Sequence, residues 1–325
     1  MNHIKHQDMK KLIIITVTVI SLFLFKGANT TVKAQYDAMF TQYMFNEMFI
    51  NPAYAGYKDA LSVTAMHRQQ WIGFEGRPIT TSVTIHSPLY QGRMGLGLSY
   101  LNEKFGVTNR NLIYISYAYR VKTGTKGRLC FGLMGGIHVQ NEKLADLAIT
   151  DPGDPHFSTN TGNVITPNFG FGMLYLTDKF FVGLSIPRLI DDQLETNSYG
   201  NVLKKIAIRP AKFHYYLTVG RIFEISESFK LKPQLMVQAV INAPIVFDLN
   251  LNALIKERLW VGVSYRSLSD ISGIIGVNVL PQFMISYSYD YSLSKLNSVS
   301  GGSHEIGLSY LFSYKGKKIS NPRYF

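Results

Sequence analysis

The side chains that most often carry enzyme chemistry are scattered along this sequence of 325 residues. The histidines that follow the first 34 residues share no spacing, and neither the HExxH zinc motif nor the GxSxG nucleophile motif occurs. These histidines are His67, His86, His138, His156, His214 and His304. A Ser/His/acid triad or a general base also needs a geometry that no spacing here provides. We therefore predict no catalytic residue and no enzymatic activity.

A second polar group gathers within one short stretch of the chain. It consists of Asp146, Asp151, Asp154 and His156. Calcium prefers such oxygen ligands, but the EF-hand spacing is missing and the Asp-Pro-Gly-Asp-Pro run is typical of a turn. Cys130 is the only cysteine, which excludes an intramolecular disulfide and a thiolate metal cluster. We therefore predict no metal and no cofactor.

Charged residues are scarce in this chain, at 17% of the sequence against about 25% in an ordinary soluble protein. Aromatic residues reach 13%, yet the mean hydropathy of +0.04 argues against a helical membrane protein. The formal charge is +12, and it becomes 28 − 20 = +8 once residues 1–34 are set aside. Lys and Arg lie mostly at segment ends rather than in a stripe, so we predict no nucleic-acid partner.

The first 34 residues have the layout of a secretory signal peptide. Three lysines precede an apolar run at residues 12–25, and a Val-Lys-Ala run ends at Ala34. The apolar run has 14 residues, whereas a membrane-spanning helix needs roughly 20. We predict export with cleavage after Ala34; an uncleaved N-terminal anchor helix is the alternative.

A period of two dominates the sequence after Tyr57, as is typical of strands with one apolar face. In residues 283–291 every odd position is apolar or aromatic, whereas three of the four even positions are small or acidic. Such runs predict fourteen strands, most of them long enough to cross a bilayer at a tilt. The predicted strands are 59–68, 79–87, 93–103, 108–120, 128–140, 167–177, 179–187, 211–222, 229–241, 244–255, 258–267, 270–280, 281–292 and 303–314.

The second face of these strands favours a transmembrane antiparallel β-barrel over a soluble sandwich or propeller. That face carries mostly Gly, Ser, Asn and Ala, whereas a soluble sandwich carries Lys, Glu and Arg there. Small uncharged residues suit the interior of a modest barrel, whose apolar face then meets lipid. Tyrosines near strand ends fit the aromatic girdles of such barrels, although strand propensity alone also explains them. They are Tyr100, Tyr117, Tyr119, Tyr265, Tyr287, Tyr289, Tyr291, Tyr310 and Tyr314.

The lengths of the connections indicate which end of the barrel faces outward. The longest linkers, 141–166, 188–210 and 294–302, follow odd-numbered strands, whereas the tight links mostly follow even-numbered ones. Short periplasmic turns and long outer loops are the rule for such barrels, which puts both termini in the periplasm. The tight link at 242–244 on the outer side is an exception.

The start of the mature chain, residues 35–58, lacks the alternation. Its aromatic and Met side chains can line one side of a short helix that the run Asn51–Gly56 then breaks. These side chains are Phe40, Tyr43, Met44, Met48 and Phe49. We predict a short helical or irregular segment that acts as a plug or a periplasmic docking segment, or that simply seals the base of the barrel.

Several runs of this sequence resemble the opening and the end of the PorP/SprF family. They are Gln42-Tyr43-Met44-Phe45-Asn46, Asn51-Pro52-Ala53-Tyr54-Ala55-Gly56, the run from Arg68 to Pro78 with Thr80, His86-Ser87-Pro88-Leu89, and Asn321-Pro322-Arg323-Tyr324-Phe325. The resemblance covers the whole mature chain. It implies an outer-membrane β-barrel of the type IX secretion system of Bacteroidota, which also serves gliding motility.

The resemblance also implies partners rather than chemistry. Members of the family act with secreted surface proteins, including large adhesins, and help their export or hold their C-terminal domains at the cell surface. Others couple to periplasmic components of the secretion and gliding machinery. We therefore expect a secreted protein's C-terminal domain as the partner, captured by the outer loops 141–166 and 188–210.

The run from Arg68 to Pro78 crosses from the first predicted strand into the first outer loop. It supplies the candidate partner or constriction contacts Arg68, Gln69, Trp71, Phe74, Glu75 and Arg77. Arg68 can pair with Glu75, and two glycines permit tight turns. The loop either packs inside the barrel as a constriction or touches a partner, where aromatic residues and Arg are favoured contacts.

The alternative function is a general porin or a small-solute transporter, since fourteen strands can leave a lumen lined by Asn and Ser. The predicted organisation is a signal peptide at 1–34, a periplasmic or plug segment at 35–58, an outer-membrane barrel at 59–314 and a C-terminal tail at 315–325. The sequence leaves open the identity of the cargo and whether the lumen is plugged.

Overall fold

Strands dominate the computed structural model, which describes residues 40–58, 60–147, 159–196, 202–267 and 269–312. The predicted signal peptide, the predicted C-terminal tail and the polar positions Asp151, Asp154 and His156 lie outside the described residues. Within the described part, no helix combines the length and the apolar character needed to cross a membrane.

The strand bounds follow the predicted ranges closely. The strands are β1 (Leu61–Gln69), β2 (Ile79–Leu89), β3 (Met94–Phe105), β4 (Thr108–Thr123), β5 (Gly127–Glu142), β6 (Val164–Leu176), β7 (Phe180–Ile186), β8 (Asp191–Thr196), β9 (Val202–Ala207), β10 (Tyr215–Arg221), β11 (Phe223–Ser226), β12 (Phe229–Ala239), β13 (Val246–Ile255), β14 (Leu259–Arg266), β15 (Asp270–Leu280), β16 (Phe283–Ser292) and β17 (Ser303–Phe312). All pairs are antiparallel, and each of the fourteen predicted strands overlaps an observed one.

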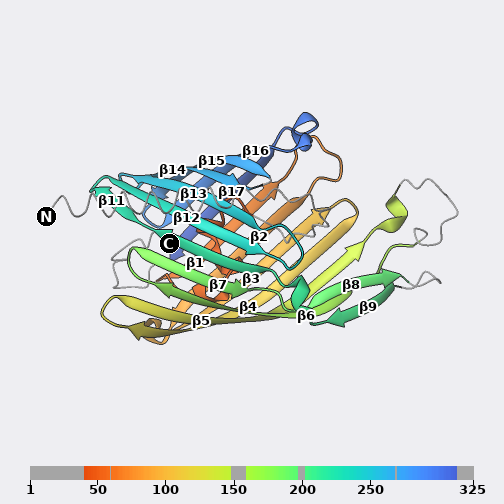
Figure 1. The fold of residues 1–325 in the computed structure, drawn as a ribbon, viewed down its shortest axis with the longest axis horizontal. Helices are drawn as coiled ribbons and strands as arrows, with labels where there is room; N and C mark the ends of the chain where they lie inside the picture. Colours follow the sequence, from red (N-terminus) through yellow and green to blue (C-terminus); the bar gives the residue numbers. More distant parts are fainter. Residues whose placement is uncertain (1–39, 59, 148–158, 197–201, 268, 313–325) are drawn as a thin grey trace. The chain divides into compact units, whose positions relative to one another are not determined.

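The main sheet closes on itself because β1 pairs with β17 and β10 pairs with β12 (Figure 1). β10 and β11 pair with successive parts of β12 and form one barrel strand interrupted at Ile222. Counted this way, the described residues form a closed antiparallel barrel of 14 strands. The predicted fold class is therefore confirmed.

Alternation separates the two faces of the barrel wall as the sequence predicts. Large apolar side chains such as Leu98, Ile115 and Leu133 are exposed on the outward face, as expected for a surface that meets lipid. Tyr117 and Tyr289 are also exposed on this face, Tyr117 in the middle of β4 and Tyr289 near the end of β16. Buried polar side chains occupy the inward positions, including Ser99, Ser116 and Asn168.

The inward face differs from the prediction in one respect, because it carries charge as well as small residues. Arg68, Asp248, Arg266, Asp290 and Glu305 are buried there. Opposite charges lie side by side in this interior, so each compensates for the desolvation of the other. The sequence count of Gly, Ser, Asn and Ala describes most inward positions but misses these pairs.

Long and short connections lie at opposite ends of the barrel, as predicted. The links 70–78, 143–163, 187–214 and 293–302 follow β1, β5, β7 and β16 and define what we call the long-loop end. The opposite, short-turn end carries tight links such as 256–258, where Lys256 and Glu257 have positive φ values of 49° and 56°. Left-handed residues of this kind suit the tight turns between twisted strands.

One element of the long loops was not predicted. The linker between β7 and β10 contains the hairpin β8–β9, a separate two-stranded sheet with Asp191 paired to Ala207. Its strands are only six residues long, so they offer little alternation to detect.

Residues 40–57 lie inside the barrel, and we call them the plug. They contain the 3-10 helices η1 (Tyr43–Phe45), η2 (Glu47–Phe49) and η3 (Pro52–Tyr54), which fits the predicted short helical or irregular segment. Asn51 caps η3 by accepting the amide of Ala53 at 2.9 Å, and Pro52 occupies its first turn. Most plug side chains are buried, including Tyr43, Met44 and Tyr54. The plug therefore occupies the lumen of the barrel that the described strands form.

Candidate functional site

An ionic cluster on three strands holds the first residues of the plug at the long-loop end. Arg68 of β1 approaches Asp290 of β16 at 2.7 Å and Glu305 of β17 at 3.1 Å, and all three side chains are buried. The same Nη1 donates to the Thr41 hydroxyl at 2.6 Å, and Thr41 Oγ1 donates to Asp290 at 2.9 Å. The amides of Thr41 and Gln42 both donate to the Glu305 carboxylate at 2.9 Å. The cluster therefore fixes the plug backbone as well as its side chains.

A second buried ion pair holds the residue at the start of the described plug. Arg266 of β14 pairs with Asp248 of β13 at 2.8 Å and donates through Nη2 to the Phe40 carbonyl at 3.0 Å. Ser264 donates to the same Asp248 carboxylate at 2.7 Å. Hydrogen bonds that involve a charged group are stronger than those between neutral groups. The bond from Arg266 to the Phe40 carbonyl therefore holds the start of the plug in addition to the cluster around Arg68.

Polar contacts also hold the middle of the plug. Thr84 of β2 donates to Asn46 Oδ1 at 2.8 Å, and Ser185 of β7 donates to the Ile50 carbonyl at 2.7 Å. Asn51 donates through Nδ2 to the Met173 carbonyl of β6 at 3.0 Å and to the Leu184 carbonyl of β7 at 3.4 Å.

The end of the plug is fixed near the short-turn end. The Gly56 amide donates to His86 Nδ1 at 3.2 Å, and Arg120 of β4 donates to the Ala55 carbonyl. The Tyr57 ring stacks on the His86 ring with centroids 5.6 Å apart. Contacts therefore run along the whole plug, from Phe40 to Tyr57.

Close approach explains two glycines of the inward face. A Cβ on Gly132 of β5 would overlap the backbone of Pro52 and Ala53, and a Cβ on Gly172 of β6 would overlap the Asn51 side chain. Glycine is required at both positions because the plug packs directly on the strand backbone. The small inward residues that indicated a barrel interior thus make room for its plug.

Glu47 is the buried acid of the plug, and it accepts a hydrogen bond from the Tyr57 hydroxyl at 3.1 Å. Burial raises the pKa of the Glu47 carboxyl, while the nearby Lys232 and Lys58 oppose that shift. The folded protein therefore favours the neutral acid more than the unfolded chain does.

Replacing Glu47 by glutamine (E47Q) should stabilise the barrel increasingly as pH rises. Below the unfolded-state pKa both forms are neutral, and above it the wild type alone loses stability as pH passes through the raised pKa of Glu47. Thermal unfolding of both proteins from pH 4 to pH 8 measures this difference. The exposed Glu75→Gln serves as the control, and a difference between E47Q and wild type that does not change with pH would contradict the prediction.

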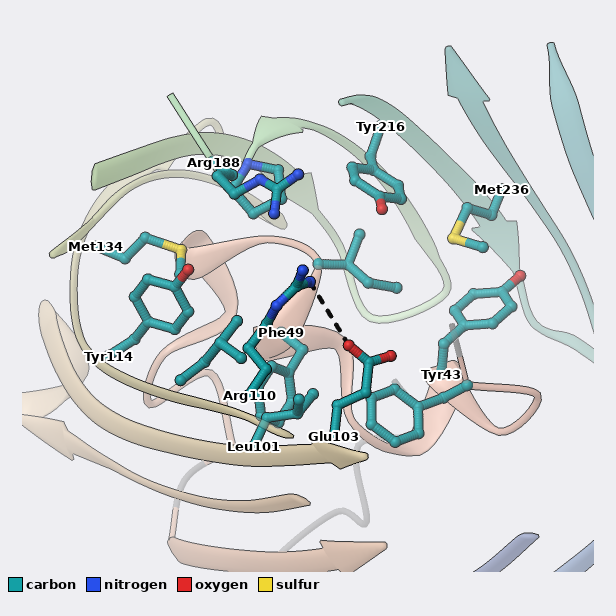
Figure 2. Close-up of a pocket in the computed structure, with 14 residues that line it drawn as sticks. Tyr43, Phe49, Leu101, Glu103, Arg110, Tyr114, Met134, Arg188, Tyr216 and Met236 are labelled. Atoms are coloured by element: carbon teal, nitrogen blue, oxygen red, sulfur yellow. Dashed lines mark ion pairs between the residues drawn. The ribbon is translucent and has the colours of Figure 1, made fainter. Parts of the chain in front are cut away.

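A pocket lies next to the plug at the long-loop end (Figure 2). Plug residues Tyr43 and Phe49 line it together with wall residues Tyr216 and Met236. The remaining lining residues are Phe40, Ile50, Leu101, Glu103, Arg110, Leu112, Tyr114, Met134, Pro187 and Arg188. Arg110 and Glu103 form an ion pair of 3.6 Å within this mostly apolar lining. The pocket is therefore a partly enclosed apolar site with charged groups.

The predicted contact residues do not come together in one site. Arg68 lies in the lumen and pairs with Asp290 and Glu305 rather than with Glu75, so the predicted Arg68–Glu75 pair is wrong. The reason is the register: Arg68 points inward from β1, whereas Glu75 is exposed on the following loop.

The other predicted contacts lie on or beside the first loop. Gln69 hydrogen-bonds to His67 at 3.1 Å on the outward face, and Arg77 reaches Gln69 at 3.4 Å. Trp71 has a positive φ of 52° and donates its amide to Ser303, while Phe74 is exposed. The loop backbone binds a neighbouring loop, with the Gly301 amide donating to the Ile72 carbonyl at 2.7 Å. Partner contact by Trp71 and Phe74 stays a prediction.

The residues that sequence reasoning missed are the charged partners of the plug and of the pocket. They are Glu103, Arg110, Asp248, Arg266, Asp290 and Glu305. A usable signal was present, because each stands in the inward phase of its strand, where a charge requires a partner.

The described histidines take structural positions. His138 hydrogen-bonds to the Tyr114 hydroxyl, and His304 to the Tyr287 hydroxyl at 2.7 Å. Within the described ranges no group of three His, Cys, Asp or Glu side chains is placed to hold a metal ion.

Three solved structures are similar to this chain at low sequence identity. The monoaromatic hydrocarbon channel CymD is 15% identical, with 85% of this chain and 94% of that chain covered and a TM-score of 0.48. The toluene transporter TbuX of Ralstonia pickettii is 11% identical, with 82% and 93% covered and a TM-score of 0.49. Omp33 of Acinetobacter baumannii is 8% identical, with 78% and 100% covered and a TM-score of 0.44.

No curated protein matches the sequence. The family model described as "Type IX secretion system membrane protein PorP/SprF" matches residues 32–310, which is most of the chain and includes the plug and the barrel strands to Tyr310. The chain therefore belongs to the PorP/SprF family of type IX secretion system membrane proteins.

Proposed function

We propose that this outer-membrane barrel binds a secreted surface protein, such as an adhesin, and assists its export or its attachment to the cell surface. The partner's C-terminal domain is the part that is bound, at the long-loop end. The barrel performs no catalysis itself. Its own export uses a signal peptide cleaved after Ala34.

The plug is the observation that carries this proposal. A general porin needs a continuous water-filled lumen, whereas residues 40–57 occupy this one and are hydrogen-bonded along their length. Because the lumen is filled, the surfaces through which this barrel interacts with other molecules are its two exposed ends. This favours a binding protein over the alternative of a general porin or small-solute transporter.

The long-loop end is the side on which a secreted partner arrives, since long loops of such barrels face the cell exterior. The connection from β5 to β6 and the connection from β7 to β10, which carries the hairpin β8–β9, are the two longest at that end. The short-turn end faces the periplasm, where a component of the secretion or gliding machinery is the second proposed partner.

Deleting the gene should remove one or more secreted proteins from the cell surface. Quantitative mass spectrometry of surface-shaved peptides measures this, with complementation by the full-length gene as the control. Export and attachment of every surface protein at the wild-type level would overturn the proposal.

Planar-bilayer recording separates the proposed function from the porin alternative. The purified wild-type barrel should show no stable open channel, because the plug obstructs the lumen. A stable open pore in the wild type, together with an unaltered set of surface proteins in the deletion strain, would establish the alternative.

A further inference from the structure

We propose that the pocket at the long-loop end receives an aliphatic side chain that lies next to a carboxylate in an extended segment of the secreted partner. This inference rests on the proposed function and specifies the chemistry of the partner at one site. Four properties of the pocket support it: its lining, its size, its charge and its position.

The lining matches an apolar side chain. Phe49 and Ile50 come from the plug, while Leu112, Met134 and Met236 come from three different strands of the wall. Two of these are methionines, whose flexible side chains adapt to the shape of a guest. Burying apolar surface there gains free energy in proportion to the area removed from water.

The size of the pocket selects a small guest. Its cavity volume is about 80 Å³, whereas an engineered cavity of about 150 Å³ is known to hold benzene. A branched aliphatic side chain fits this space, but an acyl chain of a lipid does not. The pocket is also only partly enclosed, so a side chain can enter it while its backbone stays outside.

The charge of the pocket favours an acidic neighbour. Two arginines, Arg110 and Arg188, line it together with one carboxylate, Glu103. Arg110 is held in place by Gln140, which accepts from its Nε at 3.2 Å, and by the Phe105 ring at 5.7 Å. Its contact with Glu103 uses Nη1, and no contact of Nη2 is found within the described residues. A guanidinium fixed in this way presents donors suited to a carboxylate.

The position of the pocket suits a polypeptide that arrives from outside. Pro187 and Arg188 begin the long connection after β7, and Arg110 lies near the turn between β3 and β4, both at the long-loop end. In Figure 2 Arg188 and Arg110 lie across the pocket from each other. A partner segment that crosses this opening meets both arginines before its side chain reaches the plug.

Site-specific photo-crosslinking in cells tests the occupant directly. A benzophenone amino acid replaces Tyr216, which lines the pocket, or Tyr215, its neighbour on the outward face of the same strand. The Tyr216 position should crosslink to a secreted protein, at a peptide with an aliphatic residue beside Asp, Glu or a C-terminal carboxylate. The Tyr215 position should not.

Three other crosslinking results would overturn the inference. A crosslink to residues 35–39 of the same chain would show that the pocket is filled by the protein itself. A crosslink to lipid would show that its guest is not a polypeptide, and no crosslink at Tyr216 would show that it has no guest in cells.

A filling substitution provides a second, independent measurement. Met134→Trp occupies the pocket, whereas Leu133→Trp makes the same change on the lipid-facing side of the same strand, where Leu133 is 63% exposed. Recovery of the partner with the full-length barrel from native membranes should fall about tenfold for M134W, as for loss of a central contact, and stay at the wild-type level for L133W.

A charge substitution completes the test. Arg188→Glu should reduce recovery of the partner about tenfold, whereas Lys126→Glu, at an exposed position of the short turn between β4 and β5 at the opposite end of the barrel, should leave it unchanged. Full recovery with both M134W and R188E would overturn the inference about the pocket. A different result would contradict the proposed function itself, namely that deletion of the gene changes the level of no surface protein.

Discussion

Replacing Arg68 by alanine (R68A) is expected to release the start of the plug and to open the lumen. Arg68 is buried between Asp290 and Glu305, at 2.7 and 3.1 Å. Its loss leaves two carboxylates close together without the cation that contacts them both, and breaking a buried ion pair of this kind costs about 3–5 kcal/mol. The Thr41 hydroxyl loses its hydrogen bond from Arg68 as well. Repulsion within the cluster then favours withdrawal of the plug from β16 and β17.

Two measurements follow the effect of R68A. The temperature of unfolding in detergent should fall, and planar-bilayer recording should show channel openings that the wild type lacks. Arg68→Lys should be intermediate, because it keeps the charge but not the shape of the guanidinium. Arg77→Ala, on the first loop, is the control. A closed and equally stable R68A barrel would show that the cluster does not hold the plug.

Replacing Gly132 by leucine (G132L) is expected to displace the middle of the plug without removing any charge. The new side chain would occupy the position of the Pro52 and Ala53 backbone, inside a wall that is closed by hydrogen bonds on both sides. Overpacking of a well-filled interior typically costs about 1–3 kcal/mol. Individual hydrogen bonds hold the plug to the wall, whereas β5 is paired along its length with both β4 and β6. We therefore expect the plug to move and the strand to stay in place.

Displacement is measured by exposure of the plug. A cysteine in place of Met44, in a Cys130→Ser background, should react with a maleimide mass tag faster in G132L than in the parent protein. Gly273→Leu is the matched control, since a Cβ there meets nothing within 4 Å on the exposed outward face of β15. Equal labelling rates in all three proteins would contradict this explanation of the inward glycines.

The strands were predictable because each carries its own signal. In β16 the alternation of Ile285, Tyr287 and Tyr289 with Ser286 and Ser288 depends only on neighbouring residues, and one apolar face per strand is enough to identify the strand. The lengths of the links then gave the orientation. The hairpin β8–β9 escaped the same reasoning because its short strands lie within a linker.

The plug and its anchors were less predictable because they depend on residues distant in sequence. Thr41 and Glu305 are 264 positions apart and still form a hydrogen bond of 2.9 Å. The inward phase of Arg68 can be read from β1, but its partner depends on which strands lie beside β1, and the neighbouring Glu75 was the wrong choice. Knowing that β1 pairs with β17 identifies Glu305 at once, since it stands opposite Arg68 in the register.

The pocket was not predictable at all from local patterns. Phe49, Arg110, Met134 and Tyr216 belong to the plug and to three strands, and each has an ordinary place in its own segment. Only the closed sheet, which sets the distance between opposite walls, brings them around one cavity. The predicted contacts on the first loop came from a single run of sequence and therefore remained dispersed.

The ionic cluster at Thr41 has a consequence for biogenesis. Arg68 stands on the first strand of the barrel, whereas Asp290 and Glu305 stand on the last two. The cluster is therefore complete only when the first and last strands meet, the most distant pairing in the chain and the slowest kind to form. Fixation of the start of the plug and closure of the barrel by the β1–β17 pairing therefore take place in the same step. A chain whose insertion stops before β17 is therefore neither closed nor locked at the start of its plug.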